Sequence, residues 1–149
     1  MLERAQATAF LVSARTTGEA NDTNGITLFL IARDTPGVTI ARQHRVDHRA
    51  AAIVSFDNVK VGQDSVVGSV DGGYQALTHT VDRATVGLCA EMVGGMSHIF
   101  ETTLDYLKTR EQFDVIIGTF QALKHRAARL FMELELARSS AMAAARAAD

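Results

Sequence analysis

The sequence predicts an α+β protein in which an antiparallel β-domain is followed by two long antiparallel helices of an incomplete helical bundle. The segment 1–68 is rich in short β-branched and aromatic runs that alternate with turn signals. In the segment 69–149, apolar residues instead recur every three or four positions, which is the helical period. A short loop joins the two helical patterns, and helices joined in this way pack antiparallel.

Four short runs in the first segment have the composition of β-strands. Between the first two runs, Asn24 and Gly25 form a pair that tolerates positive φ and favours an antiparallel hairpin. Pro36 and Gly37 predict a tight turn of the type II class before the third run. The predicted strands span residues 5–15, 26–33, 38–43 and 52–56, and a short extension is predicted at 59–61.

The first helical pattern begins near Asp71, which we interpret as its N-cap. Gly72 and Gly73 allow the chain to enter this helix in close contact with its surroundings. Gly94 and Gly95 weaken the middle of the helix, so we interpret them as the place where another helix approaches closely. The apolar positions of the pattern are Leu77, Val81, Leu88, Met92, Met96, Ile99 or Phe100, Leu104 and Leu107.

The second helical pattern starts at Phe120 and continues to Asp149. Two helices leave much of each other's circumference uncovered, so the sequence predicts that more chain or a partner completes the bundle. The apolar positions of this second pattern are Phe120, Leu123, Ala127, Leu130, Phe131, Leu134, Ala137 and Ala141.

The composition argues against several classes of function. A net charge of -2 at pH 7 is unsuited to general nucleic-acid binding. No apolar run approaches the roughly 20 residues that a membrane helix needs, so no membrane interaction is predicted. Cys89 is the single cysteine, which agrees with a reducing cytoplasm and provides no thiolate cluster. The histidines are dispersed and no catalytic motif occurs, so we assign no catalytic residue and no metal ligand.

The stretch from Arg110 to Gln121 connects the two helical patterns and has a distinctive set of side chains. Arg110 can pair with phosphate oxygens in forked geometry, and Phe113 can pack on a flat ring. Gln112 and Gln121 can donate or accept hydrogen bonds in fixed directions. We call this stretch the elbow; it either holds a flat, anionic ligand or only forms the turn between two helices.

The order of these features resembles the acyl-CoA dehydrogenase family over nearly the whole chain. A β-segment precedes an Asp-Gly-Gly helix start, Val-Asp-Arg follows in the helix, and the elbow contains Arg-Glu-Gln-Phe and then Phe-Gln. In that family, this region is the middle β-domain followed by the start of a C-terminal four-helix bundle. The resemblance implies that 1–68 is a partial middle β-domain and that 69–149 forms the first two bundle helices. The elbow residues that match the family signature are Arg110, Gln112, Phe113, Phe120 and Gln121.

The resemblance also implies a cofactor and a substrate. FAD would lie across a dimer interface, and the five matching elbow residues would reach the adenosine pyrophosphate part of the cofactor on the neighbouring subunit. Asp82 and Arg83 match a helical stretch that lies near the acyl-CoA in the family. Intact relatives would oxidise an acyl-CoA at its α,β carbons, and the chain would belong to a homo- or hetero-oligomer.

Several positions depart from the family pattern. Asp114 stands where the family usually has Gly, and its charge would repel a pyrophosphate. Ile116 replaces a common Pro, and Thr85 replaces an arginine of some members. Ala84, where some members place the catalytic base, cannot remove a proton.

We therefore expect a fragment of an acyl-CoA dehydrogenase-like oxidoreductase that is inactive alone, because the 149 residues contain neither the usual catalytic glutamate nor the segment that contacts the flavin ring. The alternative is a non-catalytic interaction module whose open helix faces complete a bundle with another chain.

Overall fold

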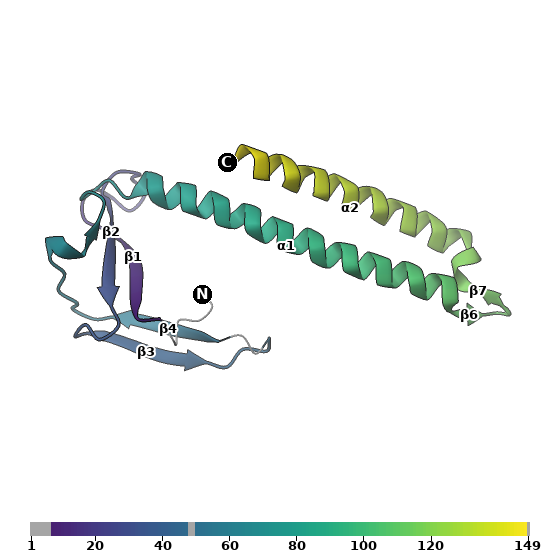
Figure 1. Cartoon of the computed structure of the whole chain (residues 1–149), viewed down its shortest axis with the longest axis horizontal. Helices are drawn as coiled ribbons and strands as arrows, with labels where there is room; N and C mark the ends of the chain where they lie inside the picture. Colours follow the sequence, from purple (N-terminus) through teal and green to yellow (C-terminus); the bar gives the residue numbers. More distant parts are fainter. Residues whose placement is uncertain (1–6, 48–49, 149) are drawn as a thin grey trace. The chain divides into compact units, whose positions relative to one another are not determined.

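The computed structural model describes residues 7–47 and 50–148. Strands come first along the chain, and two long helices with a small hairpin between them follow (Figure 1). The chain separates into two compact units, Met1–Thr78 and His79–Asp149. The predicted α+β class is confirmed, since the sheets are antiparallel and the two helices are long.

The first unit contains two antiparallel sheets. In one sheet, strand β2 lies between β1 and the very short β5, and in the other β3 pairs with β4. The pairing of β1 with β2 runs from Ala9 opposite Ala32 to Arg15 opposite Ile26. The bounds are β1 Ala9–Arg15, β2 Ile26–Ala32, β3 Val38–Gln43, β4 Ala51–Phe56 and β5 Val66–Val67.

Glycines with positive φ form the turns that the sequence predicts in this unit. Gly25 has a φ of 83°, and its carbonyl accepts the N–H of Thr16 at 2.8 Å to close the β1–β2 hairpin. Gly37 follows Pro36 and has a φ of 92°, as a type II turn requires at its third residue. The predicted hairpin and the predicted tight turn are therefore both present.

One predicted strand is wrong. Residues 59–61 belong to no strand, although their composition is β-like. The chain instead forms a 3-10 helix, η1 (Gln63–Ser65), and only then pairs with β2 through β5. Pairing with a neighbouring strand, and not composition, decides whether so short a run becomes a strand, and β5 is the run that pairs with β2.

The two sheets share one hydrophobic core. The ring of Phe10 on β1 meets the ring of Phe56 on β4 edge to face, with centroids 6.2 Å apart. Such aromatic contacts add to the free energy gained by burying the rings. The buried apolar residues of this core are Phe10, Leu28, Phe29, Ile31, Ala51 and Ala52.

Helix α1 (Tyr74–Thr109) starts two residues later than an N-cap at Asp71 predicts, and the interpretation of Asp71 as its N-cap is wrong. Asp71 has a φ of 63°, and its carboxylate accepts the hydroxyl of Thr16 instead of a helical N–H. The carbonyl of Gly73 accepts the first helical hydrogen bond, from Leu77 N–H at 3.0 Å. Gly73 therefore occupies the capping position.

Gly73 is also where the chain approaches the sheet most tightly. A β-carbon at this position would lie 2.9 Å from Leu28 Cγ and 3.0 Å from the carbonyl oxygen of Ile26. Both distances are shorter than van der Waals contact allows without movement of the neighbours. The predicted close entry into the helix is confirmed for this glycine.

In the second unit, α1 packs beside α2 (Gln121–Ala147), and the two run antiparallel (Figure 1). The rings of Phe100 and Phe131 meet at 6.1 Å between centroids, and Leu134 of α2 is buried. Arg138 Nη2 donates a hydrogen bond to Ser97 Oγ at 3.1 Å across the helix pair. The half-buried face of α1 consists of Val86, Cys89, Val93, Ser97, Phe100, Leu104 and Leu107.

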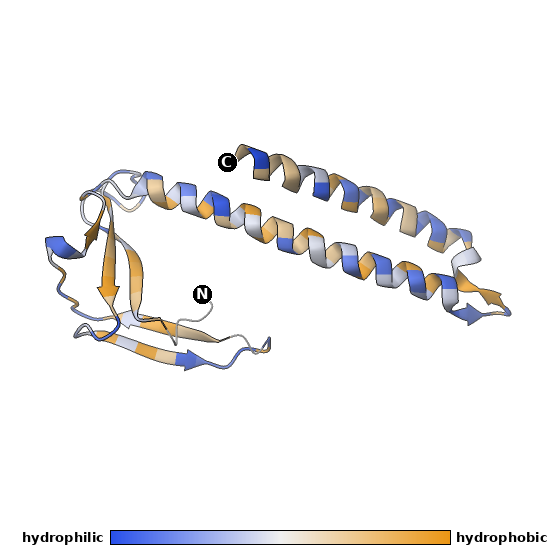
Figure 2. Cartoon of the chain, viewed as in Figure 1, coloured by the Kyte–Doolittle hydropathy of each residue, from blue (hydrophilic) through white to orange (hydrophobic). Residues whose placement is uncertain are grey.

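A second apolar stripe of α1 remains exposed. Ile99 is 67% exposed and Leu88 and Met92 are each 59% exposed, although all three belong to the predicted apolar pattern. Figure 2 shows that hydrophobic positions occur along both helices and not only between them. The described part of the helix pair thus leaves apolar surface uncovered, as the sequence predicts for two helices of a larger bundle.

The close approach predicted at Gly94 and Gly95 is not made by α2. A β-carbon at either position would have no neighbouring atom within 4 Å among the described residues. Gly87, one helical heptad earlier, is equally open. These three glycines therefore lower helix stability without providing a close approach to α2.

The first prediction concerns Gly73. Because its neighbours include backbone atoms that cannot move freely, Gly73→Ala should lower the free energy of unfolding by about 1–3 kcal/mol. Gly87→Ala is the matched control, and it should raise that free energy by about 1 kcal/mol through higher helix propensity. Urea unfolding followed by circular dichroism measures both values, and a Gly73 variant as stable as the wild type would contradict the prediction.

Candidate functional site

The elbow contains a small β-hairpin that the sequence does not reveal. After α1 ends, β6 (Glu111–Gln112) pairs antiparallel with β7 (Val115–Ile116), which leaves Phe113 and Asp114 as a two-residue loop. These two residues have φ values of 57° and 60°. Two successive positive φ values at the tip of a two-residue hairpin define a type I′ turn.

Backbone hydrogen bonds and one glycine hold this hairpin between the helices. Ile117 N–H donates to the carbonyl of Arg110 at 2.9 Å, and Arg110 N–H donates to the carbonyl of Tyr106, also at 2.9 Å. A β-carbon at Gly118, in the 3-10 helix η2 (Ile117–Thr119), would lie 2.6 Å from the carbonyl oxygen of Leu107. The elbow is thus fixed against the last turn of α1.

The cation of the elbow is available to a ligand. Arg110 is exposed, and its guanidinium has no hydrogen-bond or ion-pair partner among residues 7–47 and 50–148. An unpaired guanidinium keeps all five N–H donors for a ligand. The carboxamide of Gln112 is partly used, because its Nε2 donates to the carbonyl of Glu111 at 2.7 Å.

Two aromatic rings of the elbow contact each other. Phe113 is 87% exposed at the tip of the hairpin, and its ring meets that of Phe120 edge to face at 6.2 Å between centroids. Exposure of so large an apolar ring is unfavourable unless another surface covers it. The structure therefore brings Phe113 and Phe120 together and leaves Phe113 largely exposed.

The start of α2 adds a positive end to the same elbow. Phe120 precedes the helix without a side-chain cap, and the first turn, which begins at Gln121, contains no acidic residue. Leu123 N–H already donates to the carbonyl of Phe120 at 3.1 Å, so the N–H groups of Gln121 and Ala122 are the ones that can donate to an anion at this helix end. Lys124 lies in that first turn. The side chains of the elbow alone do not predict this positive helix end.

The second pair of predicted site residues lies near the other end of α1. Asp82 and Arg83 are both exposed, and Arg83 Nε donates to the carbonyl of Ala148 at 3.2 Å. A cation beside the carbonyls at a helix end is a common stabilising contact. Arg83 therefore has a structural partner within this unit. The 27-residue separation of Arg83 from Arg110 amounts to about 40 Å of helix, so the structure does not join the two predicted sites.

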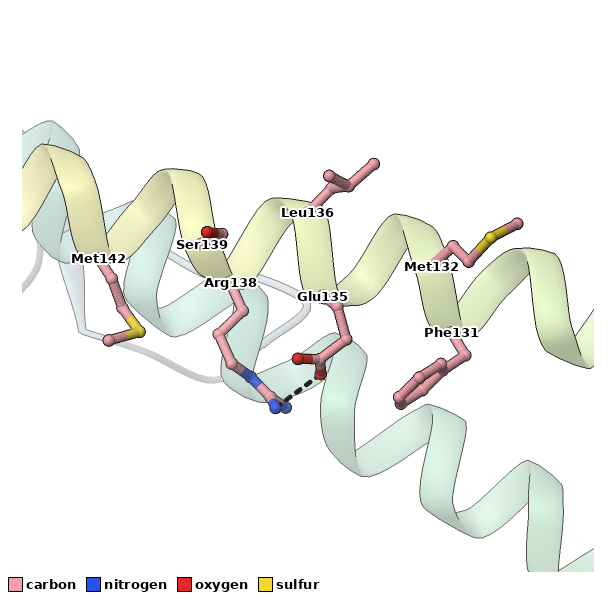
Figure 3. A pocket seen from close by; sticks show the side chains of 7 residues that line it. All are labelled: Phe131, Met132, Glu135, Leu136, Arg138, Ser139 and Met142. Atoms are coloured by element: carbon pink, nitrogen blue, oxygen red, sulfur yellow. Dashed lines mark hydrogen bonds and ion pairs between the residues drawn. The ribbon is translucent and has the colours of Figure 1, made fainter.

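A shallow groove lies on α2, well away from the elbow. Its volume is about 580 Å³, and its side chains come from four successive turns of this helix (Figure 3). An ion pair between Arg138 and Glu135, 2.7 Å long, forms one wall. The other lining residues are Phe131, Met132, Leu136, Ser139 and Met142, most of which are apolar.

Within residues 7–47 and 50–148 there is no group of three or more His, Cys, Asp or Glu side chains arranged for a metal ion. None of the described helices is both long enough and apolar enough to cross a membrane.

The second prediction concerns the turn at Asp114. Asp114→Gly and Asp114→Ala remove the same charge, but only glycine adopts a φ of 60° without steric cost. The glycine variant should therefore be about 1 kcal/mol more stable than the alanine variant in urea unfolding. Equal stability of the two variants would mean that the type I′ turn does not constrain this residue.

Comparison with known proteins identifies the class of protein to which the chain is similar. Residues 71–149 match the family model described as the acyl-CoA dehydrogenase C-terminal domain. The short/branched chain specific acyl-CoA dehydrogenase of Rattus norvegicus is 38% identical over 125 residues, which cover 82% of this chain and 29% of that protein. The chain thus spans about a third or less of such a relative.

Solved structures agree with the sequence match. The glutaryl-coenzyme A dehydrogenase in complex with glutaryl-CoA is 26% identical, with a TM-score of 0.81 over 95% of this chain and 36% of that one. The structure described as PigA with FAD and proline is 28% identical, with a TM-score of 0.80 over 91% of this chain and 36% of that one. The chain belongs to the acyl-CoA dehydrogenase family.

Proposed function

We propose that this chain is part of an FAD-dependent oxidoreductase that introduces a double bond between the α and β carbons of an acyl-CoA thioester. Membership of the family supports this proposal, as do the relatives whose descriptions name FAD and acyl-CoA dehydrogenase activity. In this proposal, residues 1–68 belong to the middle β-domain and 69–149 form the first two bundle helices. The observation that carries it is the composition of the elbow, which holds an Arg110 without a partner among the described residues, two rings in contact and a helix start without a side-chain cap.

The elbow is suited to the adenosine pyrophosphate part of FAD. The free guanidinium of Arg110 can form two parallel hydrogen bonds with phosphate oxygens. The N–H groups at the start of α2 can donate to the same anion, and the exposed ring of Phe113 can cover a flat base. Gln112 and Gln121 can supply directed hydrogen bonds at the edge of the ligand.

The negative charge of Asp114 would repel this anion, but an aspartate at this position can adopt the backbone conformation that the turn requires. The family usually has glycine after the elbow phenylalanine, and a φ of 60° at this position accounts for that preference. Aspartate is one of the residues that tolerate the left-handed region. We infer that Asp114 preserves the turn while it weakens the attraction for pyrophosphate.

The chemistry of the reaction needs groups beyond the elbow. FAD, when bound, supplies the acceptor for the hydride that leaves the β carbon. Removal of the α-proton needs a general base within hydrogen-bonding reach, and Ala84 has no group that could act as one.

In this proposal, Asp82 and Arg83 contribute to the acyl-CoA site, and the complete site is assembled in a homo- or hetero-oligomer. We also propose a cytoplasmic location.

A second candidate function is a non-catalytic interaction module that completes a helical bundle with another chain. The exposed stripe of α1 and the apolar groove on α2 favour it, because bundle helices normally bury such surfaces. This candidate requires a helical partner and no flavin. Specific FAD binding at the elbow therefore distinguishes the first function from the second.

The third prediction concerns Arg110. Arg110→Gln should weaken FAD binding by about ten-fold or more, because a charge-assisted, forked contact is lost. Arg146→Gln removes the same charge near the end of α2 and should leave the affinity unchanged. Titration by flavin fluorescence, with ADP as competitor, measures both. The absence of FAD binding to the wild type, or an equal loss in both variants, would reject the elbow as a cofactor site.

The fourth prediction concerns activity. The purified 149-residue chain with added FAD, an acyl-CoA and an electron acceptor should show no dehydrogenase turnover, because no carboxylate stands at the position of Ala84. A full-length acyl-CoA dehydrogenase serves as the positive control for substrate and acceptor. Appreciable oxidation of the thioester by this chain would show that it contains a base that we have not assigned.

A further inference from the structure

Three polar groups form a small network where the β1–β2 hairpin meets the start of α1. Thr27 has no exposed surface, and its Oγ1 accepts the backbone N–H of Asp71 at 2.8 Å. The hydroxyl oxygens of Thr27 and Thr16 are 2.7 Å apart. Thr16 Oγ1 in turn lies 2.5 Å from Asp71 Oδ1. The network thus begins and ends on the same residue.

The direction of each hydrogen bond follows from the number of protons. A hydroxyl has one proton, and an ionised carboxylate can only accept. Thr16 therefore donates to Asp71, and Thr27 must donate to Thr16. The Asp71 N–H closes the ring by donating to Thr27. The longer contact of Thr16 with the carbonyl of Gly25, at 3.3 Å, competes poorly with the charged acceptor. In such a closed ring each bond polarises the next.

This ring surrounds an unfavourable backbone conformation. Asp71 has a φ of 63°, which a residue with a β-carbon adopts only when its surroundings favour it. Directly after it, Gly72 forms a bridge with Ile26, and Gly73 N–H donates to the Ile26 carbonyl at 2.7 Å. Both backbone contacts thus depend on the path that the chain takes through Asp71.

We propose that Thr16, Thr27 and Asp71 form a latch that fixes the start of α1 on the β1–β2 hairpin, with Asp71 as a positioning residue. The carboxylate, rather than the left-handed backbone alone, holds the segment in place. Helix α1 begins directly after this segment, at Tyr74, so the latch fixes the backbone that enters its first turn.

The fifth prediction tests the latch by amide hydrogen exchange of the whole chain, measured by NMR. Asp71→Gly relieves the unfavourable φ but removes the carboxylate, so exchange of Gly73 N–H should become about ten-fold faster or more. Thr16→Val should have the same effect, whereas Thr16→Ser keeps the hydroxyl and should exchange at the wild-type rate. Amides in the middle of α2 serve as the internal reference and should not change.

Two results would overturn the proposal. Exchange at Gly73 that is as slow in Asp71→Gly as in the wild type would mean that the backbone alone holds the junction. Equal rates in Thr16→Val and Thr16→Ser would mean that the ring does not pass through the Thr16 hydroxyl. Because Thr16 is exposed, its variants should still fold. The comparison of Thr16→Val with Thr16→Ser therefore tests the proposal even if Asp71→Gly does not fold.

Discussion

The geometry of the elbow depends on one backbone hydrogen bond, from Ile117 N–H to the carbonyl of Arg110. This bond closes the small hairpin at the point where α1 has ended and α2 has not yet begun. It fixes the spacing of the two strands and so the left-handed turn at Phe113 and Asp114. The side chains proposed to bind a ligand project from this closed unit, so their positions follow from backbone geometry more than from contacts of their own.

Much of the fold could be predicted from periodicity. The change from runs of β-branched residues to a helical period near Asp71 separates strands from helices, and the positive φ of Gly37 agrees with its predicted turn. The local sequence pattern gave a wrong prediction where a residue far away in the sequence determines the backbone conformation. Asp71 looks like an N-cap, but a hydroxyl of Thr16, far away in the sequence, captures its carboxylate. The run at 59–61 is apolar enough for a strand but has no paired neighbour.

The candidate site was predictable as a set of residues but not as a shape. A cation, two rings and two carboxamides can be recognised from the sequence alone, and the ring pair of Phe113 and Phe120 is present in the structure. The type I′ turn was not recognisable, because its usual Asn-Gly or Gly-Gly signal is replaced by Phe-Asp. A helical period also cannot tell which apolar stripe faces which neighbour, and Ile99 and Phe100 are adjacent in sequence but differ in burial.

The position of Tyr106 makes the elbow accessible to optical spectroscopy. The chain has no tryptophan and two tyrosines, of which Tyr74 begins α1 and Tyr106 lies in its last turn. The carbonyl of Tyr106 accepts the N–H of Arg110, and its side chain is 56% exposed. Tyrosine emission of the protein therefore comes from two phenols near opposite ends of α1, one of which adjoins the elbow. Replacing Tyr74 by phenylalanine would leave a single native tyrosine beside the candidate site, without adding any label.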